Sequence, residues 1–216
     1  MLTFAEEILL LALDDEKGTL LPLPAEVLNY ALAGAILMEL AFQNRVDSDP
    51  THLIVLDTRK TGEPFLDGVL EEIAAKKSLT IREALYLVVA RSKEILERTL
   101  QSLVDKGILE RQEHRLFWVL KTRRYPLIDD KKETEVRTRI RSVVLDEEFP
   151  GPRDVVLINL MDACELSGTI FSFEELSNAH PRIQTVAKLD LLGQAIAATI
   201  EDIRGAIIDV LRYANI

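Results

Sequence analysis

The sequence predicts a mainly α-helical protein that folds as a single domain, residues 1–216, around two buried helices at about 25–42 and 189–213. The chain has 216 residues and 48% of them are apolar, which is enough for a sizeable core in one domain. Helix-start patterns are found along the whole chain, and the stretch 25–42 is apolar on nearly all sides. A β-hairpin at about 107–121 is expected to interrupt the helices.

The first two helices follow from residue spacing. Thr3 and Glu6 have the spacing of a capping box, and the apolar run behind them predicts the first helix. The stretch 25–42 predicts a helix buried on most of its sides, and its small residues would let a neighbouring helix come close. Glu39 is exceptional in this helix, and we expect it to be a buried acid paired with an arginine such as Arg45.

The next elements lead into the hairpin. Thr80 and Glu83 form a second capping box, and Gly107 stands where a helix is expected to stop. The predicted elements are a strand at 53–56, helices at 65–76, 84–90 and 92–106, and hairpin strands at 108–111 and 115–120 that flank a turn at 112–114.

Helices return after the hairpin. Charges of both signs predict an exposed helix that begins at Asp129, and the Phe-Pro-Gly-Pro segment 149–152 is the clearest break in the chain. Ser172 and Glu175 form a third capping box. The last helix has a wide apolar face, so we expect it to pack beside the helix at 25–42. The predicted helices are 129–145, 154–165, 172–179 and 189–213.

The residue content disfavours several classes of protein. Cys164 is the single cysteine, so no internal disulfide can form and a reducing compartment, the cytoplasm, is expected. Acids stand where a signal peptide needs basic residues, and the longest apolar run, 27–38, is too short to span a bilayer. The sequence has no glycine-rich phosphate loop, nucleophile elbow or metal-ligand spacing, so we predict no enzymatic activity, no cofactor and no metal.

Charge is divided unevenly along the chain. Residues 76–141 hold 17 of the 26 basic residues and only 10 of the 36 acidic ones, a net charge of +7, whereas the other residues carry −17. An acidic protein does not attract polyanions through its overall field. The basic segment therefore predicts one face directed at phosphates, with the rest of the protein kept away from them.

An apolar run lies at the centre of the basic segment. Residues 116–120 place large apolar side chains on both faces of a strand, so one buried face does not account for them. Ordinary core packing, a contact between subunits and a contact with lipid all remain open. Cations follow at once, and a membrane surface selects this combination. The predicted membrane contacts are Leu116, Phe117, Trp118 and Val119 for insertion, with Lys93, Arg98, Lys121, Arg123 and Arg124 for lipid headgroups.

The order helix, helix, hairpin across 80–125 is also that of a winged helix, with 92–106 as its recognition helix. Two acids among the five positions of its exposed face would repel phosphates, so we expect no nucleic-acid partner. The five positions are Lys93, Glu94, Glu97, Arg98 and Gln101.

Short motifs follow one another in an order typical of one family. The motifs are 2–15, Gly18, 32–40 with Gly34, Leu37, Glu39 and Leu40, then Arg45, 104–109, Tyr125 with Pro126, and 154–160. In this order and spacing the chain resembles the Golgi phosphoprotein 3 family over nearly its whole length.

The resemblance implies a mostly α-helical single domain around a central bundle, with the hairpin projecting from it. Members of this family are non-enzymatic peripheral membrane proteins that bind phosphatidylinositol 4-phosphate beside the hairpin. Eukaryotic members also hold glycosyltransferase tails in the Golgi, so protein tails are implied as clients. The basic N-terminal extension of those members has no counterpart here, and a short prokaryotic-type member is therefore expected.

The headgroup pocket of the family carries over only in part. Its tryptophan falls at Pro24, and the arginine of its buried helix falls at Ala33. Two arginines of the helix before the hairpin fall at Lys93, which keeps the charge, and at Leu96, which does not. Arg98 matches a neighbouring family arginine. The resemblance thus supports contact with anionic lipid more than selection of that one phosphoinositide.

The leading hypothesis is a cytoplasmic protein, peripherally associated with the membrane, that binds anionic phospholipid through a basic face and an apolar hairpin. One alternative is a protein-interaction module that forms a homo-oligomer through the hairpin and never meets lipid. The other alternative is a winged-helix regulator that binds DNA.

Overall fold

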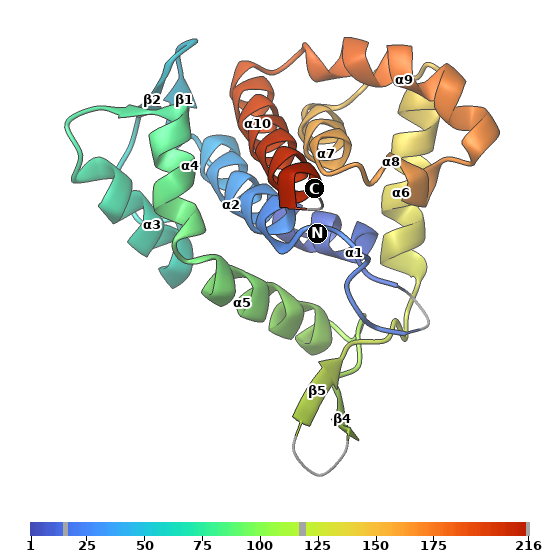
Figure 1. Ribbon diagram of the computed structural model, residues 1–216. Helices are drawn as coiled ribbons and strands as arrows, with labels where there is room; N and C mark the ends of the chain where they lie inside the picture. Colours follow the sequence, from blue (N-terminus) through green and yellow to red (C-terminus); the bar gives the residue numbers. More distant parts are fainter. Residues whose placement is uncertain (15–16, 117–119, 215–216) are drawn as a thin grey trace.

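The structure of the chain is a computed structural model. The described residues are 1–14, 17–116 and 120–214, and the description covers the backbone alone at 113–116, 120–122 and 210–214. Within these residues the protein is mainly α-helical, as the sequence predicts (Figure 1).

The core forms around α2 (Ala25–Phe42), whose bounds match the prediction. α1 (Phe4–Leu11), α7 (Pro152–Ala163) and α10 (Leu191–Ala214) all pack against it (Figure 1). A Cβ added at Gly34 would lie only 2.5 Å from Cγ2 of Ile196 on α10. The prediction that a small residue in this helix admits a close neighbour is therefore confirmed.

Length and composition alone would let α2 cross a membrane, which differs from the expectation based on the run 27–38. The same pattern is found in core helices, and 56% of α2 is buried inside the protein. Leu32, Leu37 and Leu40 on this helix are wholly buried among other side chains. The apolar character of α2 therefore has a sufficient cause in core packing.

All three predicted capping boxes are present. The Thr3 hydroxyl accepts from the backbone N–H of Glu6 at 3.3 Å, and the Glu6 carboxylate accepts from the N–H of Thr3 at 2.7 Å. Thr80 and Ser172 make the same reciprocal bonds at the starts of α4 and α9. Their helices are α4 (Ile81–Val89) and α9 (Phe173–Ala187).

A small lobe lies on one side of the core. It combines α3 (Pro64–Ala74) with an antiparallel sheet in the order β1-β2-β3. The strands are β1 (Val46–Ser48), β2 (His52–Val55) and β3 (Leu79–Thr80). The sequence predicts only the middle strand, because β1 and β3 are too short to show an alternating pattern.

The other side of the core is covered by α6 (Lys131–Leu145), α8 (Ser167–Ile170) and α9 (Figure 1). α9 continues through Pro181, although its predicted end was at 179. The guanidinium of Arg182 donates to the carbonyl of Val143 at 3.2 Å, which ties this extension to the end of α6.

The predicted partner of Glu39 is wrong. Asn44 has a positive φ of 53°, which turns the chain from α2 toward β1, and Arg45 there pairs with Asp57 at 2.6 Å. Glu39 instead lies 3.9 Å from the guanidinium of Arg153 and accepts from the N–H of Phe4 at 3.1 Å.

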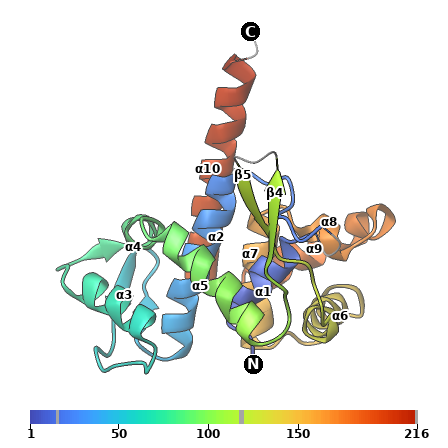
Figure 2. The same cartoon turned by 90° about the horizontal axis from the view of Figure 1, so that it is seen from below.

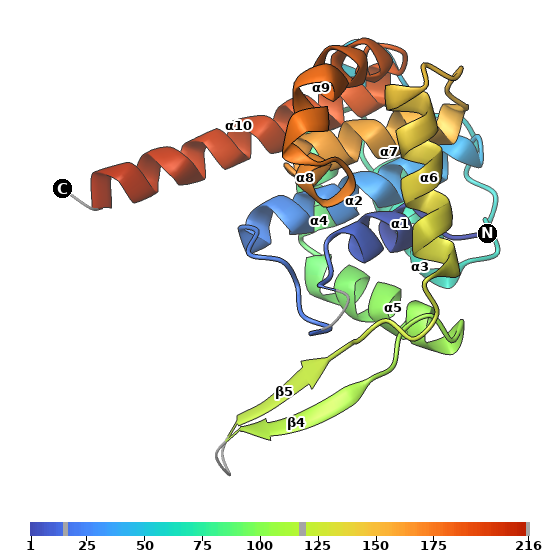
Figure 3. The same ribbon diagram turned by 90° about the vertical axis from the view of Figure 1, so that its right-hand side faces the viewer.

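The hairpin consists of β4 (Gln112–Leu116) and β5 (Leu120–Arg124), and it projects from the body (Figures 1 and 3). The prediction of a turn at 112–114 is wrong, because these residues belong to β4 and the strands are joined through 117–119. Ile108 and Leu109, predicted as hairpin strand, are buried at the hairpin base.

α5 (Ser92–Asp105) stops just before Gly107, as predicted, and this glycine has a positive φ of 67°. α10 packs beside α2, and Ile196 and Ile200 of its first half are buried. The C-terminal end of α10 extends beyond the body on the side toward which the hairpin projects (Figures 2 and 3). The hairpin and the end of α10 thus define one side of the molecule.

Candidate functional site

Many cations of the basic segment pair with acids from the rest of the protein. Arg139 on α6 contacts Glu7 at 3.0 Å, and Arg141 contacts Glu175 at 2.5 Å. Other pairs are Lys106 with Glu6, Arg82 with Asp202, and Arg91 with Glu72. The prediction that the segment forms one face directed at phosphates is therefore wrong as a whole. These five cations instead form ion pairs that join the segment to the acidic remainder.

The hairpin concentrates cations at defined positions of its ribbon. The register pairs Arg115 with Lys121 and Glu113 with Arg123, so these four positions share one face. Three of the four are basic. Arg124 pairs with Gln112 and belongs to the opposite face. The predicted headgroup residues Lys121 and Arg123 are thus brought together, and Arg124 is separated from them.

The apolar residues belong to the far end of the same ribbon. Leu116 and Leu120 pair at the last register position before the connection. Phe117, Trp118 and Val119 make up that connection and lie outside the described residues. Because β4 ends at Leu116 and β5 begins at Leu120, the predicted insertion residues are those furthest along the chain from the hairpin base.

The hairpin base is fixed to the loop between α1 and α2. The N–H of Tyr125 donates to the carbonyl of Gly18 at 2.7 Å. Leu109 forms a bridge with Leu127 across the start of the hairpin. A Cβ at Gly18 would overlap the backbone of Pro126, so the two segments are in direct backbone contact. The ribbon therefore projects from a base that is in direct backbone contact with the α1–α2 loop.

The predicted headgroup residues on α5 do not join the hairpin cations. Lys93 is exposed in the first turn of α5, whereas β4 follows the other end of that helix (Figure 1). Arg98 donates to the Glu94 carboxylate at 2.8 Å, and its guanidinium lies 5.2 Å from the centroid of the Phe65 ring. Arg98 is therefore already partnered.

Arg98 also lines a groove of about 400 Å³ between α1, α2, α3 and α5. The groove includes the carboxylates of Glu6, Glu39, Glu63 and Asp105. Burial raises the pKa of Glu39, and the backbone N–H of Phe4 opposes this shift. An anionic headgroup would meet unfavourable charge here.

The positions that match the family pocket offer little to a phosphate. Pro24 is the residue before α2, and Ala33 is wholly buried within that helix. Leu96 packs against the core. Of the four carried-over positions, only Lys93 presents a charge at the surface.

A larger hollow of about 770 Å³ lies between α7, α8, α9 and α10, and several of its polar side chains contact one another. Burial raises the pKa of Asp162, which accepts from Gln184 at 3.0 Å, and Arg204 contacts Glu165 at 2.7 Å. Cys164 is buried, which raises the pKa of its thiol to about 12 and keeps it protonated. No group of three metal-ligating side chains is found among the residues that the structure describes.

Sequence reasoning missed Arg115 as a member of the basic face. The sequence prediction placed the turn at 112–114, so it put Arg115 at the start of the second strand. Only the register of the two strands shows that Arg115 lies opposite Lys121. Sequence reasoning likewise missed the role of Gly18 in supporting the hairpin, although the glycine itself belongs to the motifs that carry the resemblance.

Comparison with known proteins agrees with the resemblance. A model of the Golgi phosphoprotein 3 (GPP34) family matches residues 4–203. The vacuolar protein sorting-associated protein 74 of Eremothecium gossypii is 33% identical over 177 residues, which cover 72% of this chain and 51% of that protein. The protein of the same name from Schizosaccharomyces pombe is 29% identical over 164 residues, covering 66% and 48% of the two chains.

A VPS74-like protein of Dictyostelium discoideum is 27% identical over 160 residues, covering 67% of this chain and 61% of the relative. The chain thus spans about half to three fifths of the length of these curated relatives. None of the printed names is that of an enzyme, which agrees with the prediction of a non-enzymatic protein. These relatives are eukaryotic, so the expectation of a prokaryotic-type member stays a prediction. The match over residues 4–203 shows that the chain belongs to the Golgi phosphoprotein 3 family.

Proposed function

We propose that this protein is a non-enzymatic peripheral membrane protein of the cytoplasmic side that docks on anionic phospholipid through its hairpin. The observation that carries the proposal is the projecting ribbon β4–β5. One of its faces has basic residues at Arg115, Lys121 and Arg123, and its far end is bounded by Leu116 and Leu120. Family membership supports a role at membranes.

The magnitudes favour weak docking by one hairpin. Each large apolar side chain that enters the interface contributes about 1.5–3 kcal/mol. Each basic residue close to an anionic surface adds about 1 kcal/mol. Association itself opposes binding by several kcal/mol. One hairpin therefore supports reversible binding, and several copies or a headgroup site would be needed for stable residence.

Selective binding of phosphatidylinositol 4-phosphate is a narrower form of this proposal. The pocket positions at Ala33 and Leu96 lack charge, and Arg98 is engaged with Glu94. We therefore expect general attraction to anionic lipid rather than strong preference for that phosphoinositide. Protein-tail clients remain a prediction from the resemblance.

The first prediction concerns the end of the hairpin. Replacing Phe117 and Trp118 together by Ser removes two large apolar groups. The partition coefficient on anionic vesicles, measured by sedimentation, should therefore fall by at least about tenfold. The unchanged protein should bind anionic vesicles and bind neutral ones poorly. Equal and negligible binding of the unchanged protein to both kinds of vesicle would contradict the proposal.

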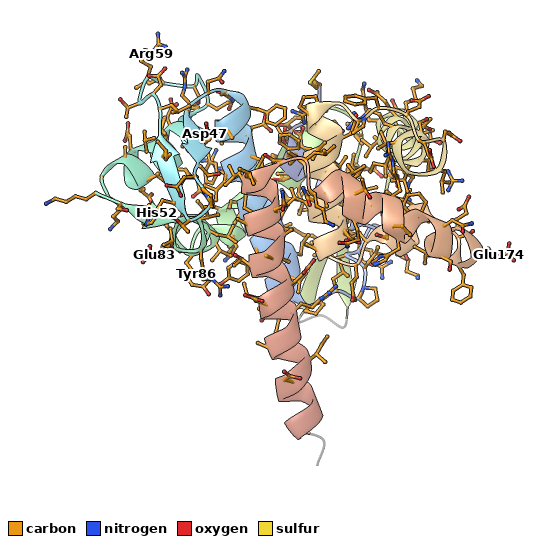
Figure 4. The ribbon with its side chains drawn as sticks, turned by 90° about the horizontal axis from the view of Figure 1, so that it is seen from above. Asp47, His52, Arg59, Glu83, Tyr86 and Glu174 are labelled. Carbon is orange, nitrogen blue, oxygen red and sulfur yellow. The ribbon has the colours of Figure 1, made fainter. Side chains whose placement is uncertain are left out.

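The second prediction concerns the basic face. Lys121→Glu with Arg123→Glu should abolish binding to anionic vesicles, because two attractive charges become repulsive. Lys76→Glu with Lys77→Glu is the matched control, since both lysines are exposed and the change in charge is the same. These lysines border the hollow beside His52, on the sheet lobe away from the projecting end of α10 (Figure 4).

The control pair should leave most of the binding intact. An equal loss in both pairs would mean that only net charge matters and that the hairpin has no special role. Vesicles with phosphatidylserine or phosphatidylinositol 4-phosphate at equal total charge should bind alike if the pocket positions are inactive.

The same variants separate the two alternatives. If the hairpin is a subunit contact, Trp118→Ser should lower the mass measured by light scattering in the absence of vesicles. If the protein is a winged-helix regulator, it should be retained by duplex DNA in a salt-sensitive way. Glu94 and Glu97 on α5 make that outcome the least favoured.

A further inference from the structure

The sheet lobe, marked by Asp47 and His52 in Figure 4, has an open strand edge. β3 pairs with only the first two residues of β2, His52 and Leu53. β2 continues to Val55, and its last two residues, Ile54 and Val55, pair with β1 alone. Within the part of the chain that the structure describes, one edge of β2 is therefore without a neighbouring strand at its C-terminal end.

The hydrogen-bond pattern shows which backbone groups lie at this edge. The N–H of Leu56 donates to the carbonyl of Arg45 at 2.8 Å, so Leu56 and Ile54 direct their backbone groups toward β1. Consecutive residues of an antiparallel strand direct these groups to opposite sides. The N–H and C=O of Val55 therefore point away from β1, and neither has a hydrogen-bond partner among the described residues.

A hollow of about 600 Å³ lies along the open edge. Ile54, Val55 and Leu79 line it together with the chain that follows α3. Ile54 is 42% exposed, and Leu56, on the same face of the strand, is 55% exposed. A single exposed apolar residue needs no explanation, whereas two alternate ones beside unpaired backbone groups are typical of a strand edge that binds a peptide.

The hollow has free positive charge. Lys76 and Lys77 line it, both are exposed, and neither forms an ion pair with a described residue. Asp49 also lines the hollow, but its carboxylate accepts from the N–H groups of Thr51 and His52 at 2.7 Å each, in the turn before β2. The charge that is not already engaged here is thus that of the two lysines.

We propose that the open edge of β2 binds an extended acidic segment of a partner protein, which adds as a strand to the sheet. Its backbone pairs with Val55, and its apolar side chains contact Ile54 and Leu56. Its carboxylates contact Lys76 and Lys77. A second copy of this chain fits less well, because its own two lysines would come to the same edge and repel these. The sheet lobe lies away from the hairpin, so the partner leaves the hairpin free (Figure 1).

Amide hydrogen exchange of the free protein tests whether the edge is open. The N–H of Val55 should exchange at least about tenfold faster than that of Ile54, because only the N–H of Ile54 faces β1. Equal protection of the two amides would mean that the edge is already occupied, and it would overturn the inference.

A labelled peptide tests the chemistry of the partner. A peptide of about ten residues, with valine and glutamate in alternation, has one apolar face, one acidic face and free backbone donors. In fluorescence anisotropy it should bind at least about tenfold more tightly than a peptide of alternating valine and lysine. The net charge of −10 on the protein favours the opposite order, so overall charge does not explain this result. Binding should also slow exchange at Val55 by at least about tenfold.

Charge reversal tests the two lysines. Lys76→Glu with Lys77→Glu should weaken binding of the valine–glutamate peptide by at least about tenfold, because two attractions become repulsions. Lys131→Glu with Lys132→Glu is the matched control, since it reverses another adjacent pair of lysines, which belongs to α6 across the core from the sheet lobe (Figure 1). The control should change the affinity by less than about twofold. Equal losses in both variants would refute a site at the open edge.

The outcomes are separate from those of membrane docking. Lys76→Glu with Lys77→Glu should lose the peptide and keep vesicle binding, so either proposal can fail while the other stands. If the valine–glutamate peptide binds but exchange at Val55 does not slow, the lysines attract carboxylates without strand addition and the inference is overturned. It is also overturned if this peptide shows no binding up to about 1 mM.

Discussion

Replacing Arg153 by methionine is expected to lower the free energy of unfolding by about 3–5 kcal/mol at neutral pH. The guanidinium of Arg153 donates to the carboxylate of Glu7 at 3.2 Å and to the carbonyl of Leu2 at 2.9 Å. It also lies 3.9 Å from the carboxylate of Glu39 and 4.0 Å from the centroid of the Phe4 ring. Its removal leaves the partly buried Glu39 without its cation, although Arg139 still pairs with Glu7.

The loss should depend on pH in a defined direction. Burial already raises the pKa of Glu39 above its ordinary value of 4.5, and Arg153 holds this shift back. Without Arg153 the folded-state pKa rises further, so the folded protein binds more protons than the unfolded chain above about pH 4.5. Stability contributed by the protonated form is then lost as the pH rises through the folded-state pKa. Arg153→Met should accordingly be less costly at pH 5 than at pH 7.5.

Urea denaturation at these two pH values measures both effects. Arg59→Met is the control, because Arg59 has a side chain that is 84% exposed and its partner Asp57 keeps Arg45. That control should cost less than about 1 kcal/mol. If Arg153→Met costs no more than the control, the ion pairs around α1 do not stabilise the fold.

The Arg153 contacts show where prediction from sequence reaches its limit. The three capping boxes and the bounds of α2 were predicted because each depends on residues close together in the chain. Glu39 was singled out as a buried acid, and its side chain is in fact partly buried, with 16% exposed; its partner is 114 positions away. Arg45, the nearby candidate, is drawn to Asp57 by the turn at Asn44. Only the packing of α7 against α1 and α2 reveals the true pair.

The candidate site was predicted in part for the same reason. The apolar run 116–120 and its basic flank are local features, so the hairpin was found, but its turn was placed at the polar triplet 112–114. The uneven charge along the chain could not show that Arg139 and Arg141 are used by Glu7 and Glu175. A charge count records composition, whereas a binding face needs a register and a fold.

Gly18→Ala is expected to lower the free energy of unfolding by about 2–4 kcal/mol, since it combines backbone strain with overpacking. Gly18 has φ of 60°, a conformation that residues with a Cβ rarely adopt. The added Cβ would also overlap the backbone of Tyr125 and Pro126. Backbone atoms cannot move aside as a flexible side chain can, so the hairpin base and the α1–α2 loop would have to separate.

Gly107→Ala is the control that isolates the strain. Gly107 has a similar φ of 67°, but no atom lies within 4 Å of the position of an added Cβ. Its substitution should cost only about 1 kcal/mol. The difference between the two variants in urea denaturation therefore measures the contact between the loop and the hairpin base. Gly18→Ala should also weaken vesicle binding more than Gly107→Ala does, because it disturbs the support of the hairpin base. Equal costs in the two variants would mean that this support yields easily, and the hairpin could then not orient the protein on a membrane.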